Sequence, residues 1–202
     1  MDYSNIFSPI RIGGRTLKSR LTHAKSGGGL DGTAKQFQRS TAYYVSVARN
    51  GSATVCMNVG TWPDCEGKQR IMSNVDMEDP AIQQGFREMI QAVHRENTLC
   101  FASLMNIEPQ EYSICELPEW NFDFQGDYNP NFKNKPSISP ERIEGMISDY
   151  VFQCQELKKL GFDGAVFYMS YRASILANAI DPVLNQRTDQ WGGSAVAERA
   201  RL

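Results

Sequence analysis

The residues best suited to chemistry lie directly after a short apolar segment, Ala165-Val166-Phe167. Two phenols, Tyr168 and Tyr171, and one guanidinium, Arg172, follow this segment. Phenol hydroxyl groups can donate hydrogen bonds to a carbonyl oxygen or to an oxyanion. These three residues are therefore candidates for activating a substrate carbonyl. Without further context, the two tyrosines would also suit packing, and Arg172 would also suit a surface ion pair.

A second candidate region is the glycine-rich stretch Lys25-Ser26-Gly27-Gly28-Gly29, which follows the expected strand 21–24. Glycines let the backbone approach a ligand closely, and Lys25 could contact an anion. The alternative is a flexible turn with a solvated lysine. His23, at the end of the strand, is interpreted as a packed histidine rather than a catalytic base.

The elements that must position these residues alternate between strands and helices. Gly161 is expected to end a helix in the left-handed conformation, and the apolar segment 165–167 then has the length of a buried strand. A helix, a tight glycine, a buried strand and polar residues at its carboxyl end form one unit of a (β/α) barrel, whose active site lies on that face.

The same alternation extends through most of the chain and predicts four such units after an amino-terminal β-hairpin. Residues 106–137 are not periodic and are rich in aromatic residues, which favours an ordered lid. The hairpin is expected at 6–20, the strands at 21–24, 53–57, 99–105 and 165–167, and the helices at 33–50, 79–94 and 139–160.

Composition narrows the class of protein. Of 202 residues, 41% are hydrophobic and 22% are charged, with a formal net charge of −2, so neither a nucleic-acid partner nor a membrane surface is indicated. No apolar run could span a bilayer, and no signal peptide is visible. The five cysteines form no C-x-x-C pair, which favours reduced thiols in a cytoplasmic protein and no metal site.

Several segments together resemble the old yellow enzyme family of FMN-dependent ene-reductases. They include F-S-P-I-R-I-G-G-R-T-L-K-S-R at 7–20, the Y-Y-x-x-x-A-x-x-G pattern at 43–51 and G-F-D-G at 161–164. The most specific is D-P-V-L-N-Q-R-T-D-Q-W-G-G-S at 181–194, which is similar to the family's S-P-x-x-N-x-R-x-D-x-Y-G-G-S signature. M-S-Y-R at 169–172 looks like the variant in the larger reductases of the family.

The resemblance implies an α/β fold of the TIM-barrel type. It covers the amino-terminal half of the barrel, so residues 1–202 are expected to form a single partial domain of about four β-α units. The implied activity is reduction of an activated C=C bond in a small-molecule substrate, with FMN as cofactor and NADH or NADPH as reductant.

The resemblance also implies roles for individual residues. The flavin is expected to lie against Ala24, Lys25, Ser26 and Gly27 after the first strand, against Gly60 after the second, and against Ser103, which replaces the family's glutamine. Tyr168 and Tyr171 replace the pair of histidines, or histidine and asparagine, that binds the substrate. Asn185, Arg187, Asp189 and Gly192-Gly193 are expected to shape the loop after the fourth strand.

Two other interpretations remain open at this stage. A half barrel leaves open sheet edges, so a complete chain of this length would need a second half-barrel or another copy of itself. Such a chain could also be a non-catalytic subunit or scaffold, a possibility raised by Ser103 and by Tyr168. Alternatively, the chain is truncated, because residues 198–202 fall within an apparent helix.

Overall fold

The computed structural model describes residues 3–24, 32–67, 75–104, 112–115, 136–167 and 174–201. These residues form two compact units. The first comprises Met1–Trp62, Ile71–Leu104 and Phe152–Phe167; the second comprises Pro63–Arg70, Met105–Val151 and Tyr168–Leu202.

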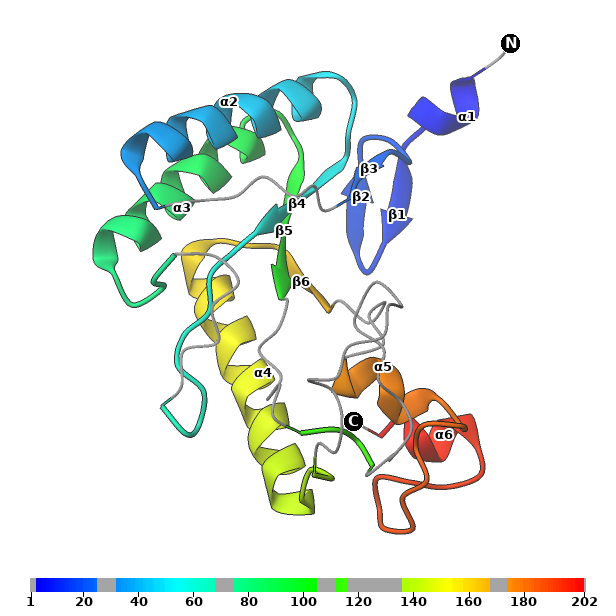
Figure 1. Ribbon diagram of the computed structural model, residues 1–202. Coiled ribbons are helices and arrows are strands. Elements are labelled where there is room, and N and C mark those ends of the chain that lie inside the picture. Colours follow the sequence, from blue (N-terminus) through cyan, green and yellow to red (C-terminus); the bar gives the residue numbers. More distant parts are fainter. Residues whose placement is uncertain are drawn as a thin grey trace, which may run out of the picture. The chain divides into compact units, whose positions relative to one another are not determined.

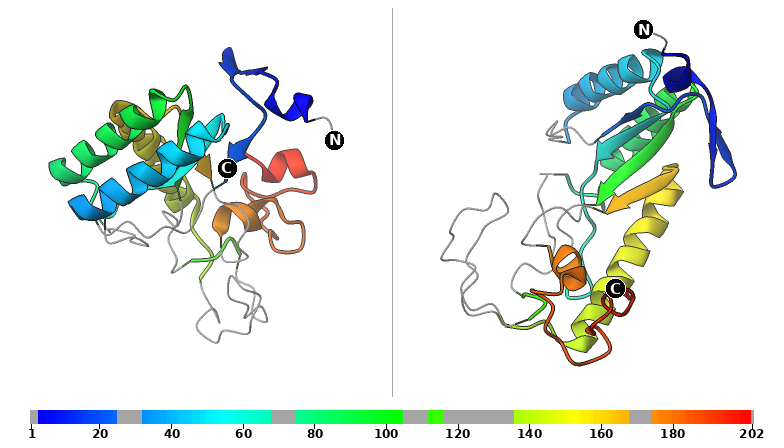
Figure 2. Two further views of the ribbon diagram at one scale, coloured as in Figure 1. Left: turned by 90° about the horizontal axis from the view of Figure 1, so that it is seen from above. Right: turned by 90° about the vertical axis from the view of Figure 1, so that its right-hand side faces the viewer.

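The first unit is built on a parallel sheet of four strands in the order β3-β4-β5-β6. Helices α2 and α3 lie side by side and contact strands β4 and β5, respectively (Figures 1 and 2). The sheet therefore confirms the predicted alternation of strands and helices. The bounds are β3, Thr22–His23; α2, Ala34–Arg49; β4, Thr54–Asn58; α3, Pro80–His94; β5, Leu99–Leu104; β6, Gly164–Phe167.

Capping residues fix the helix ends of this unit, as the sequence predicted for α3. Asp79 accepts a hydrogen bond from the backbone N–H of Ala81 at 2.8 Å, and Pro80 occupies the first helical position. At the other end of its helix, Gly161 has a φ of +106°, which allows the chain to turn from α4 into β6.

The amino-terminal hairpin is present, preceded by a short helix, α1 (Ser4–Phe7), that the sequence did not indicate. Strands β1 (Ile10–Ile12) and β2 (Arg15–Leu17) pair antiparallel through the Gly13-Gly14 turn, in which both residues have positive φ. After the hairpin, the Lys18 ammonium donates to the backbone oxygens of Ala48 and Glu96, at 2.8 and 2.7 Å. One lysine thus binds carbonyls at the carboxyl ends of both α2 and α3.

Helix α4 (Pro140–Leu160) contributes its first residues to the second unit and its last to the first. In the second unit, Arg142 stands where a capping box would have glutamate, and its side chain is buried. Its guanidinium lies 3.0 Å from the Asp64 carboxylate and 3.5 Å from that of Asp149. This unit also holds two short helices, α5 (Ile175–Ile180) and α6 (Val196–Arg199).

The four β-α units amount to half of an eight-stranded barrel. Within the described residues the sheet does not close, and β3 and β6 are its two edge strands. The predicted fold class, an amino-terminal half of a TIM-type barrel, is therefore confirmed. A single domain over residues 1–202 stays a prediction.

Candidate functional site

The predicted site residues that the structure describes lie at the carboxyl ends of neighbouring parallel strands. Ala24 directly follows β3, Gly60 lies two residues after β4, and Ser103 is the penultimate residue of β5. Parallel strands bring these ends to the same edge of the sheet, which is the edge that carries active sites in α/β folds. The predicted residues Lys25, Ser26, Gly27, Tyr168, Tyr171 and Arg172 lie outside the described ranges.

The register of the sheet shows which face Ser103 occupies. Ser103 pairs with Asn58 of β4 and with Val166 of β6, so these three side chains share one face. His23 pairs with Val55 on the opposite face, where it contacts Tyr43 and Tyr44 of α2. Ser103 therefore faces away from the helices, on the side that a closed barrel would enclose.

The Ser103 hydroxyl is a buried polar group without a partner. The residue is only 2% exposed, and its Oγ has no hydrogen bond within the described residues. Buried hydroxyls are normally hydrogen-bonded, because leaving one unsatisfied costs about 1–3 kcal/mol. An orphaned hydroxyl at the active-site edge of such a sheet is the feature expected of a ligand contact.

Gly60 is required by the fold itself. A Cβ at this position would fall well inside van der Waals contact with the Val75 carbonyl oxygen and would lie 3.0 Å from Met77 Cγ. The adjacent Thr61 forms an isolated parallel bridge with Asp76. The glycine thus lets the segment after β4 run against the segment before α3.

His23 packs against aromatic side chains of α2, although the residue is only half-buried. Its Nε2 lies 2.9 Å from the Tyr43 hydroxyl, and its ring is 5.6 and 5.9 Å from the rings of Tyr43 and Tyr44 in edge-to-face geometry. Burial lowers the pKa of His23, which keeps the imidazole neutral near pH 7. Its Nδ1 has no partner among the described residues. Burial also raises the pKa of Tyr44 to about 12, so this phenol stays protonated.

The signature segment 181–194 belongs to the second unit, and its polar side chains are occupied by structural contacts. The buried Asn185 amide donates to the backbone oxygens of Ala179 and Trp191, at 2.7 and 2.8 Å. Gly192 is needed because a Cβ there would overlap the Arg187 carbonyl. These contacts fold the loop after the fourth strand.

Arg187 links that loop to two other segments of the second unit. Its guanidinium donates to the backbone oxygens of Ile114 and Ile138, at 3.0 and 2.6 Å, and to the Asp189 carboxylate. The hydrogen bonds from Arg187 hold the pKa of Asp189 below its usual range, so the pair stays ionised. The contacts of Asn185, Arg187 and Gly192 agree with a structural role for the signature.

The sequence did not indicate the role of Asp163 in the G-F-D-G motif. Its buried carboxylate accepts from the Cys100 backbone N–H at 2.9 Å, from His94 Nε2 at 2.8 Å and from Arg15 at 3.0 Å. It therefore joins β5, α3 and the hairpin at the amino end of β6. The sequence shows the aspartate but not its partners, because these residues are distant from it in the chain.

Metal and membrane functions find no support in the described residues. No three His, Cys, Asp or Glu side chains converge there to hold a metal ion. None of the helices in those ranges combines the length and apolar character of a bilayer crossing.

The sequence model of the NADH:flavin oxidoreductase / NADH oxidase family matches residues 5–202, which is nearly the whole chain. This chain belongs to that family. The match agrees with the half-barrel sheet and with the signature segment, and it confirms the resemblance to the old yellow enzymes.

Two curated relatives are each 24% identical to the chain. One is the N,N-dimethylglycine/sarcosine dehydrogenase of Chromohalobacter salexigens, for which the alignment covers 96% of this chain and 28% of the relative. The other is the 4,4'-dithiodibutanoate disulfide reductase of Rhodococcus erythropolis, for which the alignment covers 97% of this chain and 47% of the relative. The chain thus spans less than half the length of either relative.

The fold is also similar to that of solved structures in the family. The Old Yellow Enzyme from Pichia sp. AKU4542 superposes with a TM-score of 0.70 at 22% identity, over 98% of this chain and 53% of that one. At this identity the superposition shows the fold alone. It supports the assignment of the four strands to half of a TIM-type barrel.

Proposed function

We propose that this chain is the flavin-binding half of an FMN-dependent oxidoreductase that reduces an activated C=C bond with hydride from NADH or NADPH. The observation that carries the proposal is the unsatisfied, buried Ser103 hydroxyl at the carboxyl edge of the sheet. FMN supplies the hydride chemistry when bound, and the protein supplies its binding and orientation. The family match supports the class of cofactor.

In this proposal the residues at the strand ends would hold the flavin. The segment Ala24–Gly27 and the backbone near Gly60 would contact it, and the Ser103 hydroxyl would hydrogen-bond a polar atom of it. A serine has a single hydroxyl and a short side chain, so it makes fewer contacts than an amide side chain would. Ser103 would therefore donate a single hydrogen bond.

Tyr168 and Tyr171 are proposed to bind the substrate carbonyl next to the flavin. Their hydroxyl groups would donate hydrogen bonds to the carbonyl oxygen, and Arg172 would stabilise negative charge that develops on it. The donors polarise the conjugated double bond toward hydride addition. Phenols suit this task at neutral pH because they remain protonated.

The proposal includes a second half-barrel, supplied either by the same protein or by a partner. Strands β3 and β6 are the two edges of the sheet within the described residues, and Val166 and Phe167 of β6 are 37% and 44% exposed. In TIM-type barrels the loops after strands seven and eight commonly bind phosphate. The second half would therefore close the sheet and hold the FMN phosphate.

A non-catalytic subunit is the second candidate, and the exposed apolar side chains of β6 favour it. In that role the half-barrel would serve as a docking surface for another protein. The two candidates predict different behaviour. A non-catalytic subunit, purified with its partner, would contain no flavin and would not consume NADH or NADPH in the presence of an activated alkene.

The test compares FMN binding in the purified protein and in a Ser103→Ala variant, by flavin fluorescence and absorbance. Loss of one hydrogen bond should weaken FMN binding about 5- to 10-fold. Without FMN, the same variant should unfold at a higher denaturant concentration, because it lacks the unsatisfied hydroxyl. Ser46→Ala, on the exposed surface of α2, is the matched control: it should leave FMN affinity unchanged and raise stability by no more than about 0.5 kcal/mol through helix propensity.

Two results would overturn the proposal. One is a protein that binds no FMN by absorbance or thermal shift. The other is a Ser103→Ala variant with unchanged FMN affinity and lower stability, because the hydroxyl would then support the fold rather than the cofactor. Oxidation of NADH or NADPH with an activated alkene tests the reaction itself.

A further inference from the structure

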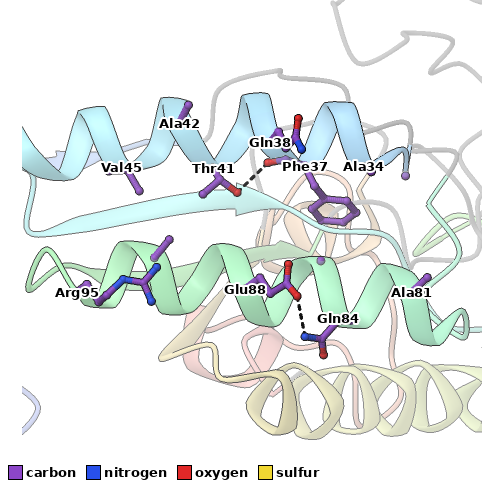
Figure 3. Close-up of a pocket in the computed structure, with 13 residues that line it drawn as sticks. Ala34, Phe37, Gln38, Thr41, Ala42, Val45, Ala81, Gln84, Glu88 and Arg95 are labelled. Carbon is purple, nitrogen blue, oxygen red and sulfur yellow. Dashed lines mark hydrogen bonds between the residues drawn. The ribbon is translucent and has the colours of Figure 1, made fainter.

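A groove of about 770 Å³ runs along the seam between α2 and α3, and it has no role in the proposed flavin site (Figure 3). The buried core residues of α3, such as Phe86, Met89 and Val93, lie on a different side of the helix from the residues that line the groove. The groove therefore opens on the outer surface of the two helices. Small side chains form much of it, including Ala42 of α2 and Ala92 of α3.

The depth of the groove depends on one close helix contact. A Cβ at Gly85 would lie 2.8 Å from the Phe37 ring, so only glycine admits this ring between the helices. Phe37 then stacks edge-to-face on Phe86, with ring centroids 5.2 Å apart. Because α2 and α3 are fixed to each other in this way, the groove is a preformed surface.

Two opposite charges flank the groove, Glu88 on α3 and Arg95 at the helical C-cap position directly after it. Glu88 and Arg95 both line it, both are exposed, and neither forms an ion pair within the described residues. The one hydrogen bond of Glu88 to the part of the chain that the structure describes comes from the Gln84 amide, which donates to the Glu88 carboxylate at 2.9 Å (Figure 3). Seven residues separate the two charges, so they project from nearly the same side of the helix, about 10 Å apart along its axis.

This arrangement is self-complementary. If a second α3 helix packs antiparallel across a two-fold axis, Glu88 of each copy faces Arg95 of the other. The axis then passes beside Ala92, close to the midpoint between the charges. A small side chain at a helix crossing allows the two helices to approach closely.

We propose that the α2–α3 groove is a dimer interface, in which a second copy of this chain packs its own α3 antiparallel into the groove. The apolar lining supplies the buried surface, and the two Glu88–Arg95 pairs fix the antiparallel orientation. A strongly charged ligand does not fit this surface, because the two flanking charges cancel. The proposal is independent of flavin binding.

Cysteine cross-linking tests the position of the two-fold axis. An Ala92→Cys variant should form a disulfide-linked dimer on mild oxidation, since each residue 92 would face its own copy. The parent protein measures the background from the exposed native Cys65. Gln155→Cys, on the exposed surface of α4, is the matched control and should not exceed that background.

Charge reversal tests the orientation. Glu88→Arg and Arg95→Glu each replace two attractive pairs with two repulsive ones, which should weaken the dimer about 10- to 30-fold. The double variant Glu88→Arg/Arg95→Glu recreates both pairs and should restore the parent affinity. Lys158→Glu, an equal charge change on exposed α4, should leave the dimer unaffected.

Sedimentation measures the dimer affinity of each variant, and both tests must agree with the proposal. It is overturned if the parent protein stays monomeric at every accessible concentration, or if Ala92→Cys cross-links no better than its control. It is also overturned if the single charge variants dimerise like the parent, or if the double variant fails to recover.

Discussion

Replacing Asp163 with alanine should destabilise the first unit strongly, and the contacts of its carboxylate give the magnitude. The side chain is 7% exposed and accepts from three donors on different elements. The most important donor is the Cys100 N–H, because Cys100 is 0% exposed and this donor is shielded from solvent. Leaving that donor unsatisfied costs about 1–3 kcal/mol.

The other two contacts of Asp163 contribute less. The Arg15 side chain is 61% exposed, so its ion pair is worth at most about 1 kcal/mol. His94 is 37% exposed and adds a similar amount at most, roughly 1 kcal/mol. The sum for Asp163→Ala is therefore about 1–5 kcal/mol, and the backbone contact is its largest contribution.

Urea unfolding of three variants separates these contributions. Asp163→Asn keeps one acceptor oxygen and should lose about half as much stability as Asp163→Ala. Arg15→Ala removes only the exposed pair and should lose less than about 1 kcal/mol. If Asp163→Ala loses no more stability than Arg15→Ala, the carboxylate is not satisfying a buried donor and the reasoning is wrong.

Two further predictions concern buried polar groups. Arg142→Met leaves two nearly buried carboxylates without their cation and should destabilise the protein by about 3–5 kcal/mol in urea unfolding. Arg142→Lys keeps a cation beside the carboxylates and should therefore lose less stability than Arg142→Met. His23 has a lowered pKa in the folded state, so below the unfolded pKa of about 6.5 the unfolded chain binds more protons. The free energy of unfolding should thus fall as the pH drops below that value. In denaturant titrations, a His23→Phe variant should lose less of this free energy than the parent protein over the same pH range. An equal loss in both proteins would contradict this assignment.

The elements of the first unit could be predicted because local signals coincide there. Asp79-Pro80 marks the start of α3, and Gly161 marks the end of α4. The apolar segments that separate one helix from the next have the length of buried strands. Each of these signals depends on residues within a few positions of one another. Helix α5, with six residues and no measurable period, offered no comparable signal.

The polar contacts that join the elements could not be predicted, because they depend on partners distant in sequence. The Arg142–Asp64 pair spans 78 positions and the His94–Asp163 pair spans 69. A sequence shows that Asp163 and Arg142 are charged but not which groups they meet once the helices pack. The family resemblance correctly located the signature loop, yet the specific donors and acceptors of Asn185 became visible only in the fold.

Gly60 and Ser103 differ in what they reveal about function, although the resemblance assigns both to the flavin. At Gly60 a Cβ would overlap the Val75 carbonyl oxygen, so this position would need glycine even in a protein that never binds a cofactor. The Ser103 hydroxyl has no such explanation, because no group in the described residues satisfies it and the fold would be more stable with alanine. A group that opposes folding and lies at the edge where ligands bind is best explained by a function, and Ser103 therefore discriminates between an enzyme and a scaffold where Gly60 does not.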